Sequence, residues 1–171
     1  MTNIPTLETE RLTLRPHRLD DFEAHAALWA NEDVVRFITS EPSTREQSWS
    51  RMLRLAGMWH HMDFGFLAIV EKESGRFIGE AGFLEARREM EPSIEGTMEL
   101  GWALIPSAHG RGYATEALIA MIGWAETHFP GKPMTCIISP ENQASLRVAA
   151  KLGFRETVRA QYNGEIIQFS R

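Results

Sequence analysis

The sequence has a single cysteine and no apolar run long enough to cross a bilayer. Because Cys136 has no second thiol to join, no disulfide can form within the chain, and a lone cysteine in an apolar stretch usually packs in the core. The first residues lack the basic segment and apolar core of a signal peptide. A net charge of −5 argues against the concentrated basic face that general nucleic-acid binding needs. We therefore expect a cytoplasmic protein that binds neither membranes nor nucleic acid directly.

No internal repeat, low-complexity tract or linker interrupts residues 1–171. With 43% hydrophobic residues, the chain suits one domain. Such a domain buries about 70% of the surface that its unfolded form exposes. His60 and His61 lack a second pair of ligands at a suitable spacing, so we expect no metal site. The sequence thus predicts a single domain over residues 1–171, as a monomer or a homodimer.

Hydrophobic spacing predicts strands and helices in alternating order, as in an α/β protein. The expected strands cover residues 12–15, 66–70, 77–84, 98–105, 134–138, 154–162 and 165–169. The expected helices cover residues 20–31, 43–59, 112–129 and 143–152. Two pairs, Ser74-Gly75 and Asn163-Gly164, favour tight turns between neighbouring strands.

Capping signals mark the first two helices. Asp20 with Glu23, and Ser43 with Glu46, have the spacing of a capping box. The second helix has one apolar face, which we expect to pack in the core rather than to bind a cofactor. That face consists of Trp49, Met52, Leu53, Ala56 and Trp59.

Residues 85–97 are polar and irregular, which favours a mobile loop. Arg87 and Arg88 lie among Glu85, Glu89 and Glu91. The mixture indicates a solvated loop of both charge signs rather than an anion-binding patch. This loop and residues 31–44 would shape the entrance for a substrate, without any recognisable code for its identity.

The stretch His-Gly-Arg-Gly-Tyr-Ala-Thr-Glu-Ala at residues 109–117 joins an extended segment, stopped by Pro106, to a strongly helical one. The first N–H groups of a helix lack internal partners and carry the positive end of its dipole, so they bind phosphate oxygens. Gly110 and Gly112 present no Cβ, which allows close approach. The junction predicts a pyrophosphate site, although two glycines can also occur in a loop that binds no ligand. The spacing lacks the third glycine and acidic ribose contact of a dinucleotide fingerprint.

A second block, residues 142–154, reads as a short capped helix that a glycine ends and a strand follows. Together the two blocks resemble the GNAT superfamily of acetyl-CoA-dependent N-acetyltransferases, whose cofactor loop is written Q/R-x-x-G-x-G/A. Residues 109–114 occupy that loop, with His109 in place of the usual Gln or Arg. The N-x-x-S and K-L-G-F elements, with E-R-L-T-L-R-P at residues 10–16, are most similar to the subgroup containing the ribosomal-protein-alanine N-acetyltransferases. The resemblance covers nearly the whole chain.

The resemblance implies a mixed, mostly antiparallel sheet of about seven strands flanked by about four helices. The strand at 98–105 and the strand containing Cys136 would splay apart to form the acetyl-CoA slot. Backbone groups of Trp102, Ala103 and Leu104 would pair with the pantetheine amides, and one N–H would polarise the thioester carbonyl. The expected pyrophosphate contacts are His109, Gly110, Arg111, Gly112, Tyr113, Ala114 and Thr115. Asn142 would bond the cofactor near its thioester, although it can also cap the next helix.

Aminolysis of a thioester needs a neutral amine, a donor for the oxyanion and a proton for the leaving thiolate. The glutamate and tyrosine that many superfamily members use align here with Ile137 and Ala149. Ser145 is therefore the candidate proton donor, directly or through water, although it can instead bond to the helix backbone. Glu99 is the candidate base through water, although it can instead be an exposed partner of an arginine. Cys136 as a nucleophile would need a nearby base that the sequence does not indicate.

The resemblance implies transfer of acetyl from acetyl-CoA to a primary amine by direct attack in a ternary complex, without a metal. The expected acceptor is the α-amine at a protein N-terminus. A small-molecule amine is the alternative acceptor, and an acyl-CoA sensor without turnover is the alternative function. Release of free thiol separates the enzyme from the sensor.

Overall fold

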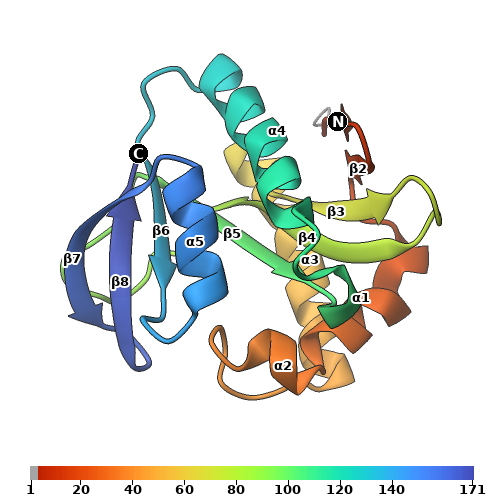
Figure 1. Ribbon diagram of the computed structural model, residues 1–171, viewed down its shortest axis with the longest axis horizontal. Helices are drawn as coiled ribbons and strands as arrows, with labels where there is room; N and C mark the ends of the chain where they lie inside the picture. Colours follow the sequence, from red (N-terminus) through yellow and green to blue (C-terminus); the bar gives the residue numbers. More distant parts are fainter. Residues whose placement is uncertain (1–3) are drawn as a thin grey trace.

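The computed structural model describes residues 4–171 as one eight-stranded sheet with helices on both faces (Figure 1). Its strands are β1 (Leu7–Glu8), β2 (Leu12–Arg15), β3 (Phe66–Glu71), β4 (Phe77–Leu84), β5 (Met98–Leu104), β6 (Met134–Ile138), β7 (Arg155–Gln161) and β8 (Glu165–Ser170). Their order across the sheet is β1-β2-β3-β4-β5-β6-β8-β7. Neighbouring strands run antiparallel except for β5 and β6, which are parallel.

The helices are α1 (Phe22–Trp29), α2 (Glu32–Val35), α3 (Arg45–Met62), α4 (Tyr113–His128) and α5 (Gln143–Lys151). Short 3₁₀ turns at Leu19–Asp21 and Pro106–Ala108 precede α1 and follow β5. The predicted mixed sheet with flanking helices is confirmed, and β1 and α2 are additions to it. Both are too short to leave a periodic signal in the sequence. Among the helices of residues 4–171, none has the length and apolarity that a membrane crossing requires.

Alternation along β4 separates the two faces of the sheet. Ala81 and Phe83 belong to the main apolar cluster, together with Leu118 and Met121 of α4. Glu80 points to the other face, where its carboxylate contacts Trp29 of α1. The main core therefore lies between the sheet and α4, and a polar side chain of the same strand faces α1 and α3.

Helix α3 buries Met52 and Trp59 of the face that we predicted, but not the whole face. Its most buried side chains are Ser48, Met52, Leu55 and Trp59. Trp49 and Leu53 are instead 39% and 51% exposed. The predicted Ser43 cap is also wrong by one residue, because Thr44 and Gln47 form the capping box. The packing of α3 against the sheet decides which stripe is buried, and it leaves Trp49 and Leu53 outside that stripe.

The first helix also begins differently from the prediction. The Arg18 N–H donates to Asp21 Oδ2 at 2.7 Å at the start of the 3₁₀ turn before α1, and Asp20 and Glu23 form no capping box there. Asp21 is buried and receives two hydrogen bonds from Arg15, at 2.7 and 2.8 Å. This ion pair attaches the start of α1 to the end of β2.

Residues 85–97 contain no helix or strand, as predicted for a loop. The expectation of a solvated mixed-charge loop is nevertheless wrong at several positions. Met90 and Ile94 are buried in a small cluster with Ile166 of β8, and Arg88 turns inward to Glu99. These long-range contacts cannot be read from local composition, which is what the loop prediction used.

Candidate functional site

The turn from β5 to α4 places two glycines in the left-handed region. Gly110 has φ = 70°, and Gly112, the N-cap of α4, has φ = 78°. A Cβ at Gly110 would meet no atom within 4 Å, so the space beside its backbone is open. The N–H groups of Tyr113, Ala114 and Thr115 begin a helix of 16 residues and have no acceptor among the described residues. An open backbone surface at the positive end of a helix suits a phosphate group.

Arg11 holds this turn from the outside. Its Nε donates to Glu116 Oε2 at 2.7 Å, and its Nη1 donates to the Arg111 carbonyl at 3.0 Å. The guanidinium also lies 4.5 Å from the centre of the Tyr113 ring. Because Glu116 is occupied by Arg11, its carboxylate is drawn away from the free N–H groups of the first turn. The E-R-L element near the start of the chain thus belongs structurally to the turn.

Arg111 and Tyr113 share one carboxylate on β3. Tyr113 Oη donates to Glu71 Oε1 at 2.6 Å, and Arg111 Nη1 lies 3.1 Å from the same oxygen. Hydrogen bonds from the Ser74 and Tyr113 hydroxyls lower the pKa of Glu71, and Arg111 adds to that effect. The Arg111 side chain remains 48% exposed and is free to turn towards an anion.

His109 contributes to the turn through its ring. Its Nε2 lies 2.8 Å from the Leu104 carbonyl, which fixes the end of β5 relative to the loop. A carbonyl only accepts, so the proton of this hydrogen bond is on Nε2. The ring therefore braces the turn by holding a backbone carbonyl, a role that a side chain other than Gln or Arg can fill.

The parallel pairing of β5 with β6 is short. It joins only Met98 to Met134 and Glu99 to Thr135, while β6 continues in its pairing with β8. Beyond Glu99, β5 pairs with β4 alone, so one edge of residues 100–104 has no strand beside it (Figure 1). Along the backbone of Trp102, Ala103 and Leu104 this edge has, among the described residues, only the His109 ring bonded to it, at the Leu104 carbonyl, and an extended ligand can add itself there as a strand.

The N-terminus of α5 carries the candidate proton donor Ser145 and its neighbour Asn142. Asn142 Oδ1 accepts from the Ser145 N–H at 3.1 Å, so Asn142 caps this helix. Its amide nitrogen remains available, and so does the half-buried Ser145 hydroxyl, which has no partner in residues 4–171. Ala149 is fully buried in the main core, and Ile137 packs against the small cluster around Met90.

Glu99 is buried and paired, rather than exposed. Arg88 donates to both of its oxygens, from Nε at 2.7 Å and from Nη2 at 2.8 Å. The remaining Nη1 of Arg88 donates to Tyr162 Oη at 3.2 Å. Burial raises the pKa of the Cys136 thiol, and the charge of Glu99 adds to the effect. Cys136 therefore stays a protonated core residue at neutral pH, as its sequence context indicates.

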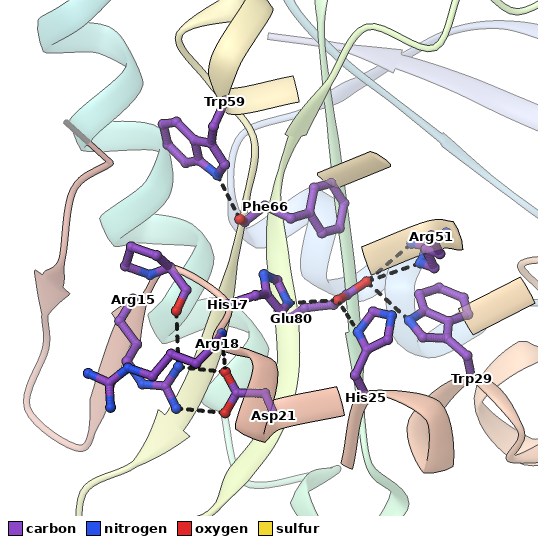
Figure 2. A network of polar contacts seen from close by, with 11 residues as sticks. Arg15, His17, Arg18, Asp21, His25, Trp29, Arg51, Trp59, Phe66 and Glu80 are labelled. Atoms are coloured by element: carbon purple, nitrogen blue, oxygen red, sulfur yellow. Dashed lines mark hydrogen bonds and ion pairs between the residues drawn. The ribbon is translucent and has the colours of Figure 1, made fainter. Parts of the chain in front are cut away.

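A second polar cluster, absent from the sequence prediction, surrounds Glu80 on β4 (Figure 2). Glu80 Oε2 lies 3.0 Å from His17 Nε2 and 3.0 Å from His25 Nδ1. Its Oε1 accepts from Trp29 Nε1 at 3.1 Å and from Arg51 Nη2 at 3.2 Å. The His25 ring is turned so that its approach is not an aligned hydrogen bond. We call these five residues the Glu80 cluster.

Nearby donors and charges keep the Glu80 carboxylate ionised. Burial alone would raise the pKa of Glu80, but the contacts from His17 and His25 and the charge of Arg51 hold it well below its ordinary value. The Arg51 guanidinium stacks on Trp29, 3.6 Å from the ring centre. A buried carboxylate with this many donors is stable only as an anion.

The two histidines and Glu80 also have a spacing that a metal ion could bridge, with their ligand atoms within 4.8 Å of one another. However, the Arg51 guanidinium lies 3.2 Å from the same carboxylate. A divalent cation beside it would meet strong repulsion at low dielectric. The cluster is therefore better described as an ion pair with two histidines than as a metal centre.

One signal in the sequence could have revealed the cluster. Glu80 interrupts the otherwise apolar strand Phe77–Leu84, and a buried charge requires a partner. The identity of its partners could not be read, because they come from α1, α3 and the segment before α1. Arg88 was missed for the same reason.

Comparisons with known proteins agree with this geometry. The family model described as "Acetyltransferase (GNAT) domain" matches residues 11–155. The uncharacterized N-acetyltransferase p20 of Bacillus licheniformis is 27% identical over 152 residues, which are 88% of this chain and 83% of p20.

Solved structures share the whole fold. A GNAT-family acetyltransferase from Bordetella pertussis superposes with a TM-score of 0.88 at 30% identity, covering 98% of this chain and 99% of that one. RimL, a ribosomal L7/L12 alpha-N-protein acetyltransferase in complex with coenzyme A, gives a TM-score of 0.79 at 18% identity, covering 98% and 97%. At 18% identity the second likeness establishes the fold alone.

Proposed function

This chain belongs to the GNAT acetyltransferase family and is an acetyl-CoA-dependent N-acetyltransferase, and from that premise we propose that it acetylates the α-amine at a protein N-terminus. The observation that carries this proposal is the state of Glu99. Each of its two oxygens accepts a hydrogen bond from Arg88, at 2.7 and 2.8 Å, which leaves less room for a proton from the amine and favours an acceptor that is already neutral. An α-amine has an ordinary pKa of about 7.7–8.0, against about 10.4 for lysine, so it is far more often neutral at pH 7. The fold shared with RimL, which acts on a protein α-amine, supports the same choice.

The residues of the β5–α4 turn fit the donor substrate. We assign the pyrophosphate of acetyl-CoA to the N–H groups between Gly110 and Thr115, with Arg111 free to add a charge from outside. The free edge of β5 would pair with the pantetheine amides through Trp102, Ala103 and Leu104. An N–H of this edge would then point at the thioester carbonyl and stabilise the oxyanion.

The residues near the thioester of acetyl-CoA would carry out proton transfer. In this proposal, Ser145 supplies a proton to the departing thiolate, directly or through water, since its hydroxyl has no partner in the described chain. Glu99 takes the amine proton through water, with Arg88 bonded to both of its oxygens. Asn142 keeps its amide nitrogen for the cofactor while its oxygen caps α5. Positioning two substrates together supplies much of the rate.

The proposal is tested with two forms of one lysine-containing peptide. One form has a free N-terminus and the other is blocked there, so that it offers lysine alone. Mass spectrometry at pH 7 and matched concentration should show faster acetylation of the free form. Preferential modification of lysine, or activity only on a polyamine or aminoglycoside, would contradict the N-terminal acceptor and leave the acetyltransferase activity intact.

Two observations favour the alternative of acyl-CoA binding without turnover. The positions of the family's glutamate and tyrosine hold Ile137 and Ala149, and neither side chain can move a proton. Under this alternative, acetyl-CoA binds but no acceptor in a panel of amines and peptides releases free thiol. Thiol release above the rate of spontaneous hydrolysis would reject it.

A further inference from the structure

Two arginines of the described chain are held by carboxylates on one face of the sheet. Arg51 of α3 pairs with Glu80 on β4, and Arg88 pairs with Glu99 on β5. Glu80 lies opposite Ala103 in the β4–β5 register, and Glu99 precedes Ala103 by four residues. An even separation keeps side chains on the same face, so both carboxylates point to the side that α1 and α3 cover.

Each arginine lies outside its carboxylate. The side chains of Arg51 and Arg88 are 18% and 23% exposed, whereas those of Glu80 and Glu99 are 0% and 8% exposed. The carboxylates therefore lie next to the sheet, and the guanidinium groups lie outside them, nearer to solvent and to a bound substrate. Both arginines are also fixed in place, Arg51 by stacking on Trp29 and Arg88 by two short hydrogen bonds.

Donors remain free at both arginines. Arg51 uses Nε and Nη2 for Glu80, and its Nη1 meets no acceptor within residues 4–171. Arg88 Nη1 donates to Tyr162 Oη, which leaves the phenolic proton for another acceptor. A guanidinium group has five N–H donors in a fixed fork that matches a carboxylate or phosphate. Two such forks on one face of the sheet, four residues apart along β5, can bind one anion from two sides.

The charges of the two arginines also act on each other. Burial lowers the pKa of Arg51, Glu80 opposes that effect, and the nearby charges of Arg54 and Arg88 lower it further. Arg51 thus lies near enough to Arg88 to be affected by its charge. An anion between the arginines would reduce their repulsion.

The arginines flank the part of β5 where acetyl transfer is expected. Glu99 and Ala103, which mark the two carboxylate positions along the strand, bracket Gly101 and Trp102. An amine that attacks a thioester at this strand would therefore place its neighbouring groups against the face that Arg51 and Arg88 share.

We propose that the acceptor carries a carboxylate or similar anion next to its reacting amine, and that Arg51 and Arg88 bind this group. The inference rests on the proposed function and names the class of its substrate. Two sources have this chemistry. One is a peptide whose first residue is acidic, and the other is a free α-amino acid with its own carboxylate.

Paired acceptors test the proposal in the intact chain with acetyl-CoA. In the peptide arm, a peptide beginning with aspartate is compared with the same peptide beginning with asparagine. In the free arm, L-alanine is compared with L-alaninamide. We expect kcat/KM to favour the anionic member by at least about tenfold, the effect of one charge-assisted hydrogen bond.

Four variants locate the effect. Arg88→Gln should reduce the preference for the anion towards one, and Arg51→Lys should weaken it while keeping the charge beside Glu80. Arg87→Gln and Arg54→Gln are the matched controls, because these exposed neighbours lie outside both ion pairs. Both controls should retain the preference. Loss of the preference in all four variants equally would contradict the assigned residues.

The outcomes separate this inference from the proposed function. Equal rates within both pairs overturn the anion site, while acetylation of the peptides still supports an N-terminal acceptor. Reaction of alanine but of no peptide supports the anion site and overturns the protein acceptor. If no amine reacts, the anion site is tested by calorimetry, in which N-acetyl-L-aspartate is added to the protein saturated with coenzyme A. Binding that exceeds that of N-acetyl-L-asparagine and is lost in Arg88→Gln supports the site, and any other result overturns it.

Discussion

The β5–α4 turn and the Glu80 cluster bind charge in opposite ways. The turn offers backbone N–H groups of consecutive residues, between Gly110 and Thr115, at the start of one helix. The cluster gathers side chains from β4, α1, α3 and the segment before α1 (Figure 2). Charge binding at the turn depends on the absence of side chains at its glycines, whereas charge binding in the cluster depends on which side chains are present. We expect substitutions in the turn to alter ligand affinity and substitutions in the cluster to alter folding stability.

The largest expected effect is the loss of the Glu80 charge. In Glu80→Gln, the buried Arg51 guanidinium loses its anion, and the free energy of unfolding should fall by about 3–5 kcal/mol. Urea denaturation followed by tryptophan fluorescence measures this change. Glu23→Gln is the control, since Glu23 pairs with Arg45 at the surface and should change stability by no more than about 0.5 kcal/mol. Equal changes in the two variants would show that the cluster contributes no more than a surface ion pair.

The second prediction concerns the turn. Gly112→Asp adds a negative charge beside the expected pyrophosphate and should weaken acetyl-CoA binding by more than about tenfold, or ~1.4 kcal/mol. Gly131→Asp is the matched control, because Gly131 has the same φ of 78° and an open surface but lies beyond the other end of α4. Calorimetry should show unchanged affinity in the control. Equal affinity of Gly112→Asp and the parent would contradict the assignment of the pyrophosphate to this turn.

Strain and charge can be separated at the same position. Gly112→Asn is neutral, and asparagine tolerates the left-handed region better than most residues. We expect it to bind acetyl-CoA more tightly than Gly112→Asp does, with a similar melting temperature. If both variants lose the same affinity, the backbone conformation matters and the added charge does not.

The third prediction divides the roles of two residues at the start of α5. Ser145→Ala should lower kcat by about tenfold with little change in acetyl-CoA affinity, because it removes a proton donor and leaves the cap in place. Asn142→Ala should also raise the KM for acetyl-CoA, and it should lower stability by about 1 kcal/mol through loss of the cap. Steady-state kinetics and thermal melting measure these changes. A Ser145→Ala protein with parental kcat would assign the donor to water or to another group.

The smallest expected effect is on the pH dependence of stability. The pKa of Glu80 is lower in the folded protein than its ordinary value, so its contribution is fully present above that value and is lost as the pH falls. With an ordinary glutamate pKa of about 4.3, this one group should remove about 0.6 kcal/mol between pH 7 and pH 4. The measure is the difference between the unfolding curves of the parent and of Glu80→Gln over this range. Parallel curves would mean that Glu80 has the same pKa in the folded and unfolded states.

The sequence predicted the turn well because its signal is local. Gly110 and Gly112 are two residues apart, and the helix that they begin has apolar residues at helical spacing over the next turns. The alternation of the strands was equally local, and β2, β4 and β6 match their predicted bounds. Helix α3 shows the limit of such reasoning. Its spacing predicted one apolar face, but packing against the sheet left Trp49 and Leu53 of that face exposed.

The catalytic predictions show a different limit. Ser145 was selected as the serine of the N-x-x-S element and Glu99 because it lies on the strand that lines the expected cleft, and their roles in catalysis stay predictions. For Glu99, spacing could not show that Arg88, from an irregular loop, would occupy both oxygens. A residue can therefore be placed on a strand from its sequence while its chemical state depends on a segment for which the sequence offers no pattern.

By itself, the sequence determined the alternating order of elements and the glycine turn that begins α4, because backbone geometry and hydrophobic spacing are properties of neighbouring residues. Only the tertiary structure decided which charges meet. Glu80 contacts His17 and Arg51, which are 63 and 29 residues away in the chain. Such pairs form because a buried carboxylate must find donors among the elements that pack against it, and packing joins segments that share no local pattern.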